Sequence, residues 1–129
     1  ILYGESIGTG VTTAIYRYIR GGVAGMVLES GFRSLRWRAA CRIPLFGALI
    51  LRTDLPSSEI LSEYLGPLML IHSRSDEVIP FEDSQVLHTS CPSGHKTFLE
   101  LKSYGHNDPV WEDPVYMQSW QDFLRQFGS

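Results

Sequence analysis

The sequence lacks several features that would point to particular classes of protein. Its two cysteines, Cys41 and Cys91, are able to pair or to stay free, but they are too few for a disulfide framework. There is no C-x-x-C or H-E-x-x-H motif, so we predict neither a metal nor an organic cofactor. No apolar stretch approaches the roughly 18 residues that a membrane span requires. The net charge of −3 gives no reason to expect a nucleic-acid partner.

What the sequence does contain is typical of one folded domain. Its 129 residues are 43% hydrophobic and 19% charged, which is too apolar for a disordered chain. The first residue is Ile1 rather than Met, and the segment 1–3 has the character of the second half of a buried strand. We therefore expect an N-terminal portion before Ile1. A leader or anchor there would decide the localisation, so localisation stays unknown, with the cytoplasm and a membrane surface as the candidates.

Strand-like and helix-like segments alternate along the chain. Short apolar runs predict buried strands at residues 1–3, 24–28, 67–72 and 98–101. After Gly10, apolar residues recur with helical spacing and predict a helix with one buried face, formed by Val11, Ala14, Ile15, Tyr18 and Ile19. The last helix is predicted to have Asp113 as its N-cap and an apolar stripe of Tyr116, Trp120, Phe123, Leu124 and Phe127. This alternation predicts an α/β fold with a mostly parallel sheet and flanking helices.

Residues 30–64, approximately, form the least regular part of the chain, which we call the insert and expect to be a lid-like segment. The insert holds five arginines and no acid before residue 53, at positions 33, 36, 38, 42 and 52. Two interpretations of this cluster stay open: a site for anionic lipid head groups or phosphate, or a solvated helix face. The apolar residues Trp37, Leu45, Phe46 and Leu49 either line an acyl pocket or pack a helix onto the sheet.

The turn after the first strand reads Gly4-Glu5-Ser6-Ile7-Gly8, which is G-x-S-x-G between a strand and a helix. In such a turn the serine projects above the sheet from a strained backbone, and Gly4 and Gly8 let strand and helix pass closely. The N–H of Ile7 at the helix N-terminus is then free to donate to an oxyanion. This context makes Ser6 a candidate nucleophile. The alternative is a plain glycine-rich turn.

A serine nucleophile needs a base, and the base needs an acid that orients it. Asp76 and His106 each follow a predicted strand by a few residues, in the chain order Ser, Asp, His. Two other carboxylates compete for the role of acid: Glu29, which more simply closes a strand, and Asp108, which more simply caps the last helix. His72 lies within a strand and is interpreted as a core histidine.

These motifs together resemble the C-terminal half of an α/β-hydrolase. Segment 3–10 is similar to the nucleophile elbow, 28–35 to the segment after strand six, 72–80 to the acid loop and 105–108 to the histidine loop. The resemblance is to a branch of small serine hydrolases related to protein depalmitoylases. It implies that Ser6 is the nucleophile, Asp76 the acid and His106 the base, and that Phe32 lies nearest the serine in a substrate pocket. It also implies earlier strands, and a second oxyanion donor, that residues 1–129 do not contain.

The predicted function is that of a serine hydrolase acting on esters or thioesters, with acyl-protein or lipid substrates, through an acyl-enzyme. One alternative is a serine peptidase of the prolyl-oligopeptidase type, and another is an inactive hydrolase-like fragment that serves as an interaction module. We expect a small-molecule or acylated substrate, association with a membrane surface and no obligate partner. Residues 1–129 alone are expected to be aggregated, molten or dimeric, because one strand edge is unpaired.

Overall fold

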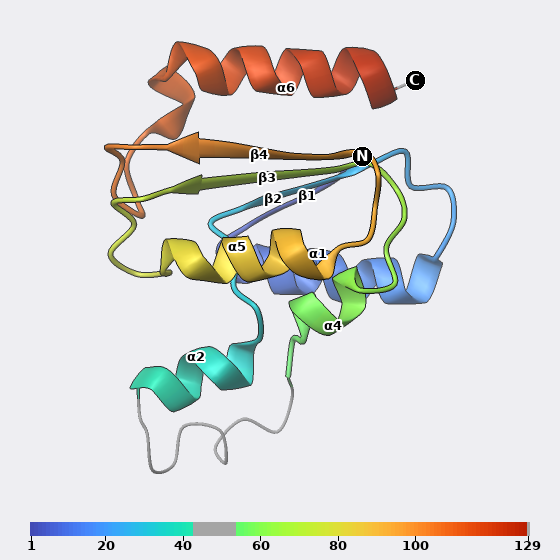
Figure 1. Cartoon of the computed structure of the whole chain (residues 1–129), viewed down its shortest axis with the longest axis horizontal. Helices are drawn as coiled ribbons and strands as arrows, with labels where there is room; N and C mark the ends of the chain where they lie inside the picture. Colours follow the sequence, from blue (N-terminus) through green and yellow to red (C-terminus); the bar gives the residue numbers. More distant parts are fainter. Residues whose placement is uncertain (43–53, 129) are drawn as a thin grey trace.

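A four-stranded parallel sheet forms the centre of the molecule. The computed structural model describes residues 1–42 and 54–128. The strands lie side by side in chain order: β1 (Leu2–Glu5), β2 (Met26–Glu29), β3 (Leu68–Ser73) and β4 (Lys96–Leu101). In the register Leu2 lies opposite Met26, Met26 opposite Leu68, and Leu68 opposite Lys96. The carboxyl ends of all four strands therefore meet at one edge of the sheet (Figure 1).

The helices cover the two faces unequally. They are α1 (Ile7–Ile19), α2 (Leu35–Arg42), α4 (Ser57–Leu61), α5 (Phe81–Ser90), the short 3₁₀ helix η1 (Val110–Glu112) and α6 (Pro114–Phe127). Figure 1 shows α1, α4 and α5 on one side of the sheet and α6 on the other. Right-handed crossovers that always step in the same direction leave their helices on the same face, so only the helix after the last strand reaches the opposite side. The predicted fold class is confirmed.

The sheet is buried on both faces, which explains why β2 and β3 are continuously apolar. Alternate residues of these strands point to opposite faces, so each face has its own core. Toward α4 and α5 the core contains Met26, Leu28, Leu61, Tyr64, Leu68, Leu70, Leu87 and Cys91. Toward α6 it contains Val27, Met69, Ile71, Leu101, Tyr116 and Phe123. Both thiols are free, with Cys41 exposed and Cys91 buried.

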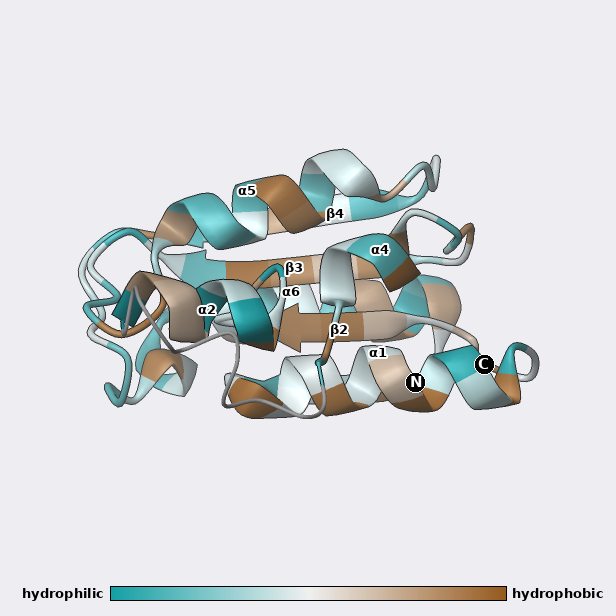
Figure 2. Cartoon of the chain, turned by 90° about the horizontal axis from the view of Figure 1, so that it is seen from below, coloured by the Kyte–Doolittle hydropathy of each residue, from teal (hydrophilic) through white to brown (hydrophobic). Residues whose placement is uncertain are grey.

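The predicted buried face of the first helix is wrong. Val11, Ile15, Tyr18 and Ile19 are all exposed, and Tyr18 is 89% exposed. Small polar residues are buried instead, namely Thr9, Thr12 and Thr13. Each threonine hydroxyl donates to a backbone carbonyl, with Thr12 bonding to Tyr3 of β1 at 3.1 Å. These small, internally satisfied side chains let α1 approach the sheet closely, and the apolar stripe is left along the margin of the molecule (Figure 2).

The last helix has the predicted cap and most of the predicted stripe. Asp113 accepts a hydrogen bond from the N–H of Val115 at 2.9 Å, and Pro114 follows it. Tyr116 and Phe123 are buried against the sheet, whereas Leu124 is exposed, contrary to the prediction. Leu124 lies one position past Phe123, which turns its side chain away from the sheet. Within the described residues, no helix is long and apolar enough to cross a membrane.

The insert connects β2 to β3 and contains α2 and α4. Helix α4 lies beside α1 and α5, whereas α2 stands away from the sheet (Figure 1). Arg33, at the start of the insert, donates from Nε to Asp83 Oδ1 in α5 at 2.8 Å, and its guanidinium lies over the Trp37 ring. The acyl-pocket interpretation of Leu45, Phe46 and Leu49 and the anion-site interpretation of Arg52 concern residues outside the described ones. That the insert acts as a lid stays a prediction.

Candidate active site

A strained turn presents Ser6 at the carboxyl end of β1. Ser6 has φ 51° and ψ −120°, a left-handed conformation that non-glycine residues seldom adopt. Its N–H donates to the carbonyl of Glu29 at 2.9 Å, which ties the turn to the end of β2. A Cβ at Gly4 would lie 2.3 Å from Thr12 Oγ1 and 2.4 Å from Gly8 O, so only glycine fits where strand and helix pass.

The prediction that Gly8 also must lack a Cβ for strand and helix to pass closely is wrong. A Cβ built on Gly8 meets nothing within 4 Å. Only the backbone of Gly8 approaches Gly4, and its own Cα hydrogen points into open space. The close passage of strand and helix therefore depends on one glycine of the motif, Gly4.

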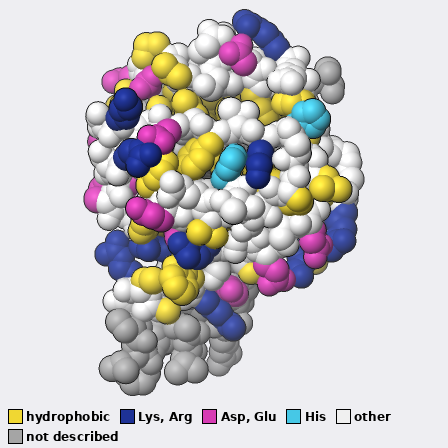
Figure 3. Space-filling model, viewed as in Figure 1, with side chains coloured by type: hydrophobic (Ala, Val, Ile, Leu, Met, Phe, Trp, Pro, Cys, Tyr) yellow, Lys and Arg dark blue, Asp and Glu magenta, His cyan; other side chains and the backbone are white. Residues whose placement is uncertain are grey.

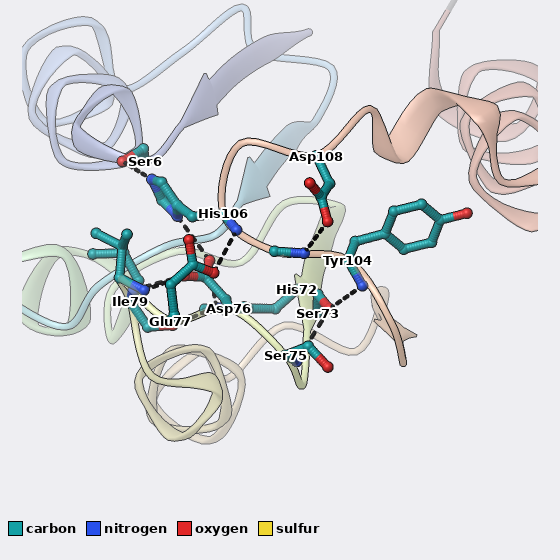
Figure 4. Close-up of polar contacts among 12 residues, drawn as sticks. Ser6, His72, Ser73, Ser75, Asp76, Glu77, Ile79, Tyr104, His106 and Asp108 are labelled. Carbon is teal, nitrogen blue, oxygen red and sulfur yellow. Dashed lines mark hydrogen bonds and ion pairs between the residues drawn. The ribbon is translucent and has the colours of Figure 1, made fainter.

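Ser6, His106 and Asp76 lie in one chain of hydrogen bonds, although they come from three loops (Figure 4). Ser6 Oγ is 3.0 Å from His106 Nε2, and His106 Nδ1 is 2.8 Å from Asp76 Oδ2. A carboxylate oxygen only accepts, so Nδ1 carries the proton of a neutral imidazole. Nε2 is then left with a lone pair that faces the Ser6 hydroxyl.

The carboxylate of Asp76 is held on both of its oxygens. Oδ1 accepts from the N–H of Val78 at 2.9 Å and of Ile79 at 2.8 Å, and Oδ2 contacts both His106 and, at 3.3 Å, His72 Nε2. Burial on its own raises the pKa of Asp76, but the contacts with the two histidines and the two backbone N–H groups outweigh it. The pKa therefore lies well below its usual range, and Asp76 is a charged group at neutral pH, with a side chain only 1% exposed.

Neighbouring polar residues join the acid loop to the histidine loop. Ser73 Oγ accepts from the N–H of Ser75 at 3.2 Å and of Tyr104 at 3.1 Å, so one buried hydroxyl bridges the two loops. Glu77 Oε2 accepts from the N–H of His106 at 3.0 Å. These contacts fix where the His106 main chain lies relative to Asp76 (Figure 4).

Asp108 does not cap the last helix, contrary to the prediction. Its Oδ2 accepts from the N–H of Gly105 at 2.6 Å, while Asp113 caps α6. Asp108 closes a short turn across the histidine loop because its carboxylate can reach a backbone donor three residues earlier. Its carboxylate is thereby directed to Gly105, and the imidazole of His106 is paired with Asp76.

Glu29 closes β2 beside Ser6, but its carboxylate turns to the α6 face of the sheet. Oε2 accepts from the hydroxyl of Tyr116 at 2.9 Å and of Tyr3 at 3.1 Å, in a buried position. Burial raises the pKa of Glu29, and the two tyrosine hydroxyls only partly offset this. Burial, followed by the nearby Glu29, also raises the pKa of Tyr116 to about 12. Glu29 therefore joins strand to helix and does not contact His106.

The other two predicted site residues have different surroundings. Ile7 is the first residue of α1, and among the described residues no hydrogen bond to its N–H is seen, as expected at a helix N-terminus. Phe32 is 2% exposed, and its ring lies against Gly10 of α1, where a Cβ would come within 3.0 Å of the ring. Its contact with a substrate stays a prediction.

Sequence reasoning missed the contacts of His72 and Glu77 with the acid and histidine loops. His72 was interpreted only as a core histidine, and its burial at 1% exposure agrees with that. A strand residue four positions before Asp76 is a signal for such a contact only if the loop folds back, which a linear pattern does not show. Among the described residues, no group of three or more His, Cys, Asp or Glu side chains is placed to hold a metal ion.

No protein-family model matches the chain, but individual proteins do. The chain is 29% identical over 130 residues to protein bem46 of Schizosaccharomyces pombe. This alignment covers 98% of the chain and 43% of bem46. The chain is 31% identical over 111 residues to alpha/beta hydrolase domain-containing protein 17C of Xenopus tropicalis, covering 84% of this chain and 33% of that one. The chain thus spans less than half the length of these relatives.

The solved structure of a thermophilic esterase from Thermogutta terrifontis superposes with a TM-score of 0.74. The match covers 98% of this chain and 65% of the esterase, at 17% sequence identity. The chain belongs to the α/β-hydrolase superfamily.

Proposed function

We propose that this α/β-hydrolase chain carries the catalytic residues of a serine hydrolase that cleaves esters or thioesters through an acyl-enzyme. The observation that carries the proposal is the hydrogen-bond chain from Ser6 through His106 to Asp76, presented by the strained turn after β1. An imidazole that a buried carboxylate orients is placed to remove the proton of the serine hydroxyl, and this makes the serine a nucleophile.

The geometry gives each residue a role in the reaction. His106 Nε2 accepts the Ser6 hydroxyl proton while Oγ forms a bond to the substrate carbonyl carbon. The carbonyl oxygen becomes an oxyanion that accepts from the Ile7 N–H, and the imidazolium is stabilised by Asp76 through Nδ1–H. When the tetrahedral intermediate collapses, the bond to the leaving oxygen or sulfur breaks and Nε2–H donates its proton to that atom.

The second half of the reaction repeats these roles with water. His106 Nε2 removes a proton from a water molecule as the water oxygen attacks the acyl carbon. The bond from that carbon to Ser6 Oγ then breaks, and the proton returns to Oγ. The carboxylic acid leaves, and Ser6 is restored. Every proton moves through His106, so Asp76 stays charged throughout.

The test uses a fluorophosphonate probe, which phosphonylates an activated serine. In the full-length protein that contains these residues, we expect labelling at Ser6, and we expect Ser6→Ala to abolish it. Ser75→Ala is the matched control, because Ser75 lies in the acid loop and donates to Lys102 O rather than to an imidazole. Labelling that survives in Ser6→Ala, or that maps to another serine, would end the nucleophile assignment.

The substrate class is tested with matched acyl compounds of one chain length. A p-nitrophenyl ester, a thioester and a p-nitroanilide differ only in the leaving atom. We expect turnover of the ester and the thioester in the wild type and none in Ser6→Ala. Preference for the anilide would favour the peptidase alternative. Absence of both labelling and turnover in the full-length protein would favour the inactive interaction module.

A further inference from the structure

His72 lies outside the hydrogen-bond chain that the proposed function uses, yet it contacts the acid directly. Its side chain is fully buried at the end of β3, and its ring stacks edge-on against Phe81. Nε2 is 2.9 Å from the carbonyl oxygen of Ile79 and 3.3 Å from Asp76 Oδ2. Nδ1 is 2.6 Å from Ser84 Oγ in α5. Figure 4 shows His72 beneath the acid loop, beside Asp76.

The partners of the ring place a proton on Nε2. The carbonyl of Ile79 only accepts, so Nε2 must carry a proton to bond to it. The Ser84 hydroxyl lies 2.6 Å from Nδ1 and donates to the carbonyl of Gly31 at 3.4 Å. His72 therefore turns the N–H of Nε2 toward Ile79 and Asp76.

Both main-chain polar groups of Ile79 are hydrogen-bonded in this arrangement. Its carbonyl accepts from His72, and its N–H donates to Asp76 Oδ1 at 2.8 Å. The Asp76 carboxylate thus closes the loop from Asp76 to Ile79, and His72 joins the end of that loop to β3. With Oδ1 occupied by backbone N–H groups, Oδ2 is left directed at His106 Nδ1.

We propose that His72 is a positioning residue for Asp76: its Nε2–H clamps the acid loop through Ile79, so that Oδ2 of Asp76 faces His106. This proposal rests on the proposed function for its effect on catalysis. Its structural half, the dependence of the Asp76–His106 hydrogen bond on His72, is independent of turnover. A packing residue would need only the shape of the ring, whereas this role needs the Nε2–H.

Two substitutions at His72 distinguish the effect of the ring shape from the effect of the Nε2–H donor. His72→Phe keeps a ring against Phe81 but removes the Nε2–H. His72→Gln keeps a donor, because the amide nitrogen of Gln is separated from Cβ by the same number of bonds as Nε2 of His. His88→Phe is the matched control, since His88 is a partly buried ring that stacks on Phe98 in α5 and β4, away from the acid loop.

The first measurement is kinetic, in the full-length protein with the ester described above. Displacing a catalytic group by a fraction of an ångström costs roughly tenfold or more in rate. We expect His72→Phe to lower kcat about tenfold with KM within about twofold. His72→Gln should recover most of the loss, and His88→Phe should match the wild type. A His72→Phe enzyme with unchanged kcat per titrated active site would overturn the proposal.

The second measurement needs no turnover and therefore remains informative if the proposed function fails. In the Ser6→Ala protein, the proton shared by His106 Nδ1 and Asp76 should give a low-field imidazole signal in the proton NMR spectrum. We expect that signal to disappear or move in His72→Phe and to persist in His72→Gln. An unchanged signal in both variants contradicts the clamp.

The third measurement uses the wild-type residue, so it stands even if His72→Phe does not fold. Nitrogen-15 chemical shifts of the His72 ring report which nitrogen is protonated. We expect a protonated Nε2. A ring with its proton on Nδ1 alone has nothing to donate to Ile79 and would refute the assignment.

Discussion

At the scale of single residues, the proposed mechanism ranks three substitutions. Ser6→Ala and His106→Ala each remove a group that makes or breaks bonds, so each should lower kcat/KM by about 10⁴-fold or more. Asp76→Asn should cost less than either, because the imidazole stays in place while its orientation and charge are no longer supported. Steady-state ester kinetics on the full-length protein measure all three.

The control for this ranking is Asp108→Asn. Asp108 bonds to the Gly105 N–H rather than to an imidazole, and asparagine keeps an acceptor oxygen. We expect near wild-type activity. If Asp108→Asn were the harmful change and Asp76→Asn harmless, the assignment of the acid would be wrong.

Glu29 predicts a pH dependence of stability. Its pKa is raised by burial above its ordinary value of 4.5, so the folded state retains the proton to a higher pH than the unfolded state does. The stability that this proton contributes is full below the unfolded pKa and is lost as the pH rises through the folded pKa. Glu29→Gln has no such proton. The wild type should therefore lose stability relative to Glu29→Gln between pH 4 and neutral pH, as measured by urea midpoints.

An exposed carboxylate provides the control for Glu29. Glu112 is exposed on η1. The difference in urea midpoint between the wild type and Glu112→Gln, measured over the same pH range, gives the baseline for an exposed carboxylate. A Glu29→Gln difference that varies with pH no more than this baseline would mean that the Glu29 carboxyl is not desolvated.

Sequence position was enough to place Ser6, Asp76 and His106 together, because the ends of parallel strands converge at one edge of a sheet. It was not enough for Glu29 or His72. Glu29 ends an apolar strand and His72 lies within one. The two-residue alternation of side chains along a strand shows which face of the sheet each side chain takes, but not which polar group lies on that face. The partners of Glu29 are Tyr3 and Tyr116, which are separated by more than a hundred residues.

At the scale of elements, an ion pair joins the start of the insert to α5, between a part-buried arginine, Arg33, and a buried carboxylate, Asp83. Asp83 has a side chain only 2% exposed, and its Oδ1 accepts a hydrogen bond from Arg33 Nε at 2.8 Å. Among the described residues, Asp83 Oδ2 has no hydrogen-bond partner. Removing the arginine would leave a buried charge without compensation, which typically costs about 3–5 kcal/mol.

We therefore expect Arg33→Met to lower the free energy of unfolding by about 3–5 kcal/mol in urea denaturation. Arg33→Met combined with Asp83→Leu should cost less, because the second change removes the unpaired charge. Arg17→Met breaks an exposed pair with Glu59 and should cost no more than about 1 kcal/mol. Equal losses for Arg33→Met and Arg17→Met would show that the Arg33–Asp83 pair is no anchor.

The strands and the last helix could be predicted because burial on two faces, or a proline-led cap, leaves a local pattern. The covered face of α1 could not. Its apolar stripe has ideal helical spacing, but the residues it buries are Thr9, Thr12 and Thr13, whose hydroxyls donate to backbone carbonyls. Periodicity identifies an amphipathic helix. Which of its faces is buried depends on how closely the backbones of the helix and of the sheet must approach.

At the scale of the whole molecule, charged groups of both signs are interleaved across the face seen in Figure 3. Two of the insert's arginines, Arg38 and Arg42, each donate to the carbonyl of Val78 in the acid loop. These contacts do not decide between the two interpretations of the arginine cluster, a solvated helix face and a site for anionic head groups or phosphate. Association with an anionic membrane surface accordingly stays an untested prediction for the insert.

The margin formed by β1 and α1 predicts how residues 1–129 behave when expressed alone. β1 is an edge strand, and beside it α1 exposes Ile7, Val11 and Ile15. An unpaired apolar edge promotes association, and each large apolar side chain that becomes covered contributes roughly 1.5–3 kcal/mol. Several such contacts are comparable with a typical net stability of about 5–15 kcal/mol. We expect this chain to be dimeric, aggregated or molten in sedimentation experiments, with poor turnover of p-nitrophenyl esters.

A matched pair of substitutions decides whether this margin is responsible. Ile15 and Leu124 are both 45% exposed on helices, but only Ile15 lies in the apolar stripe of α1. Ile15→Glu places a charge in the stripe and should shift the sedimentation profile toward monomer, because covering the stripe would then desolvate a carboxylate. Leu124→Glu should leave association unchanged, since it lies on α6 at the other face of the sheet. A monomeric wild-type chain with a sharp, cooperative thermal transition and Ser6-dependent turnover would refute the prediction and show that these residues suffice as a minimal hydrolase.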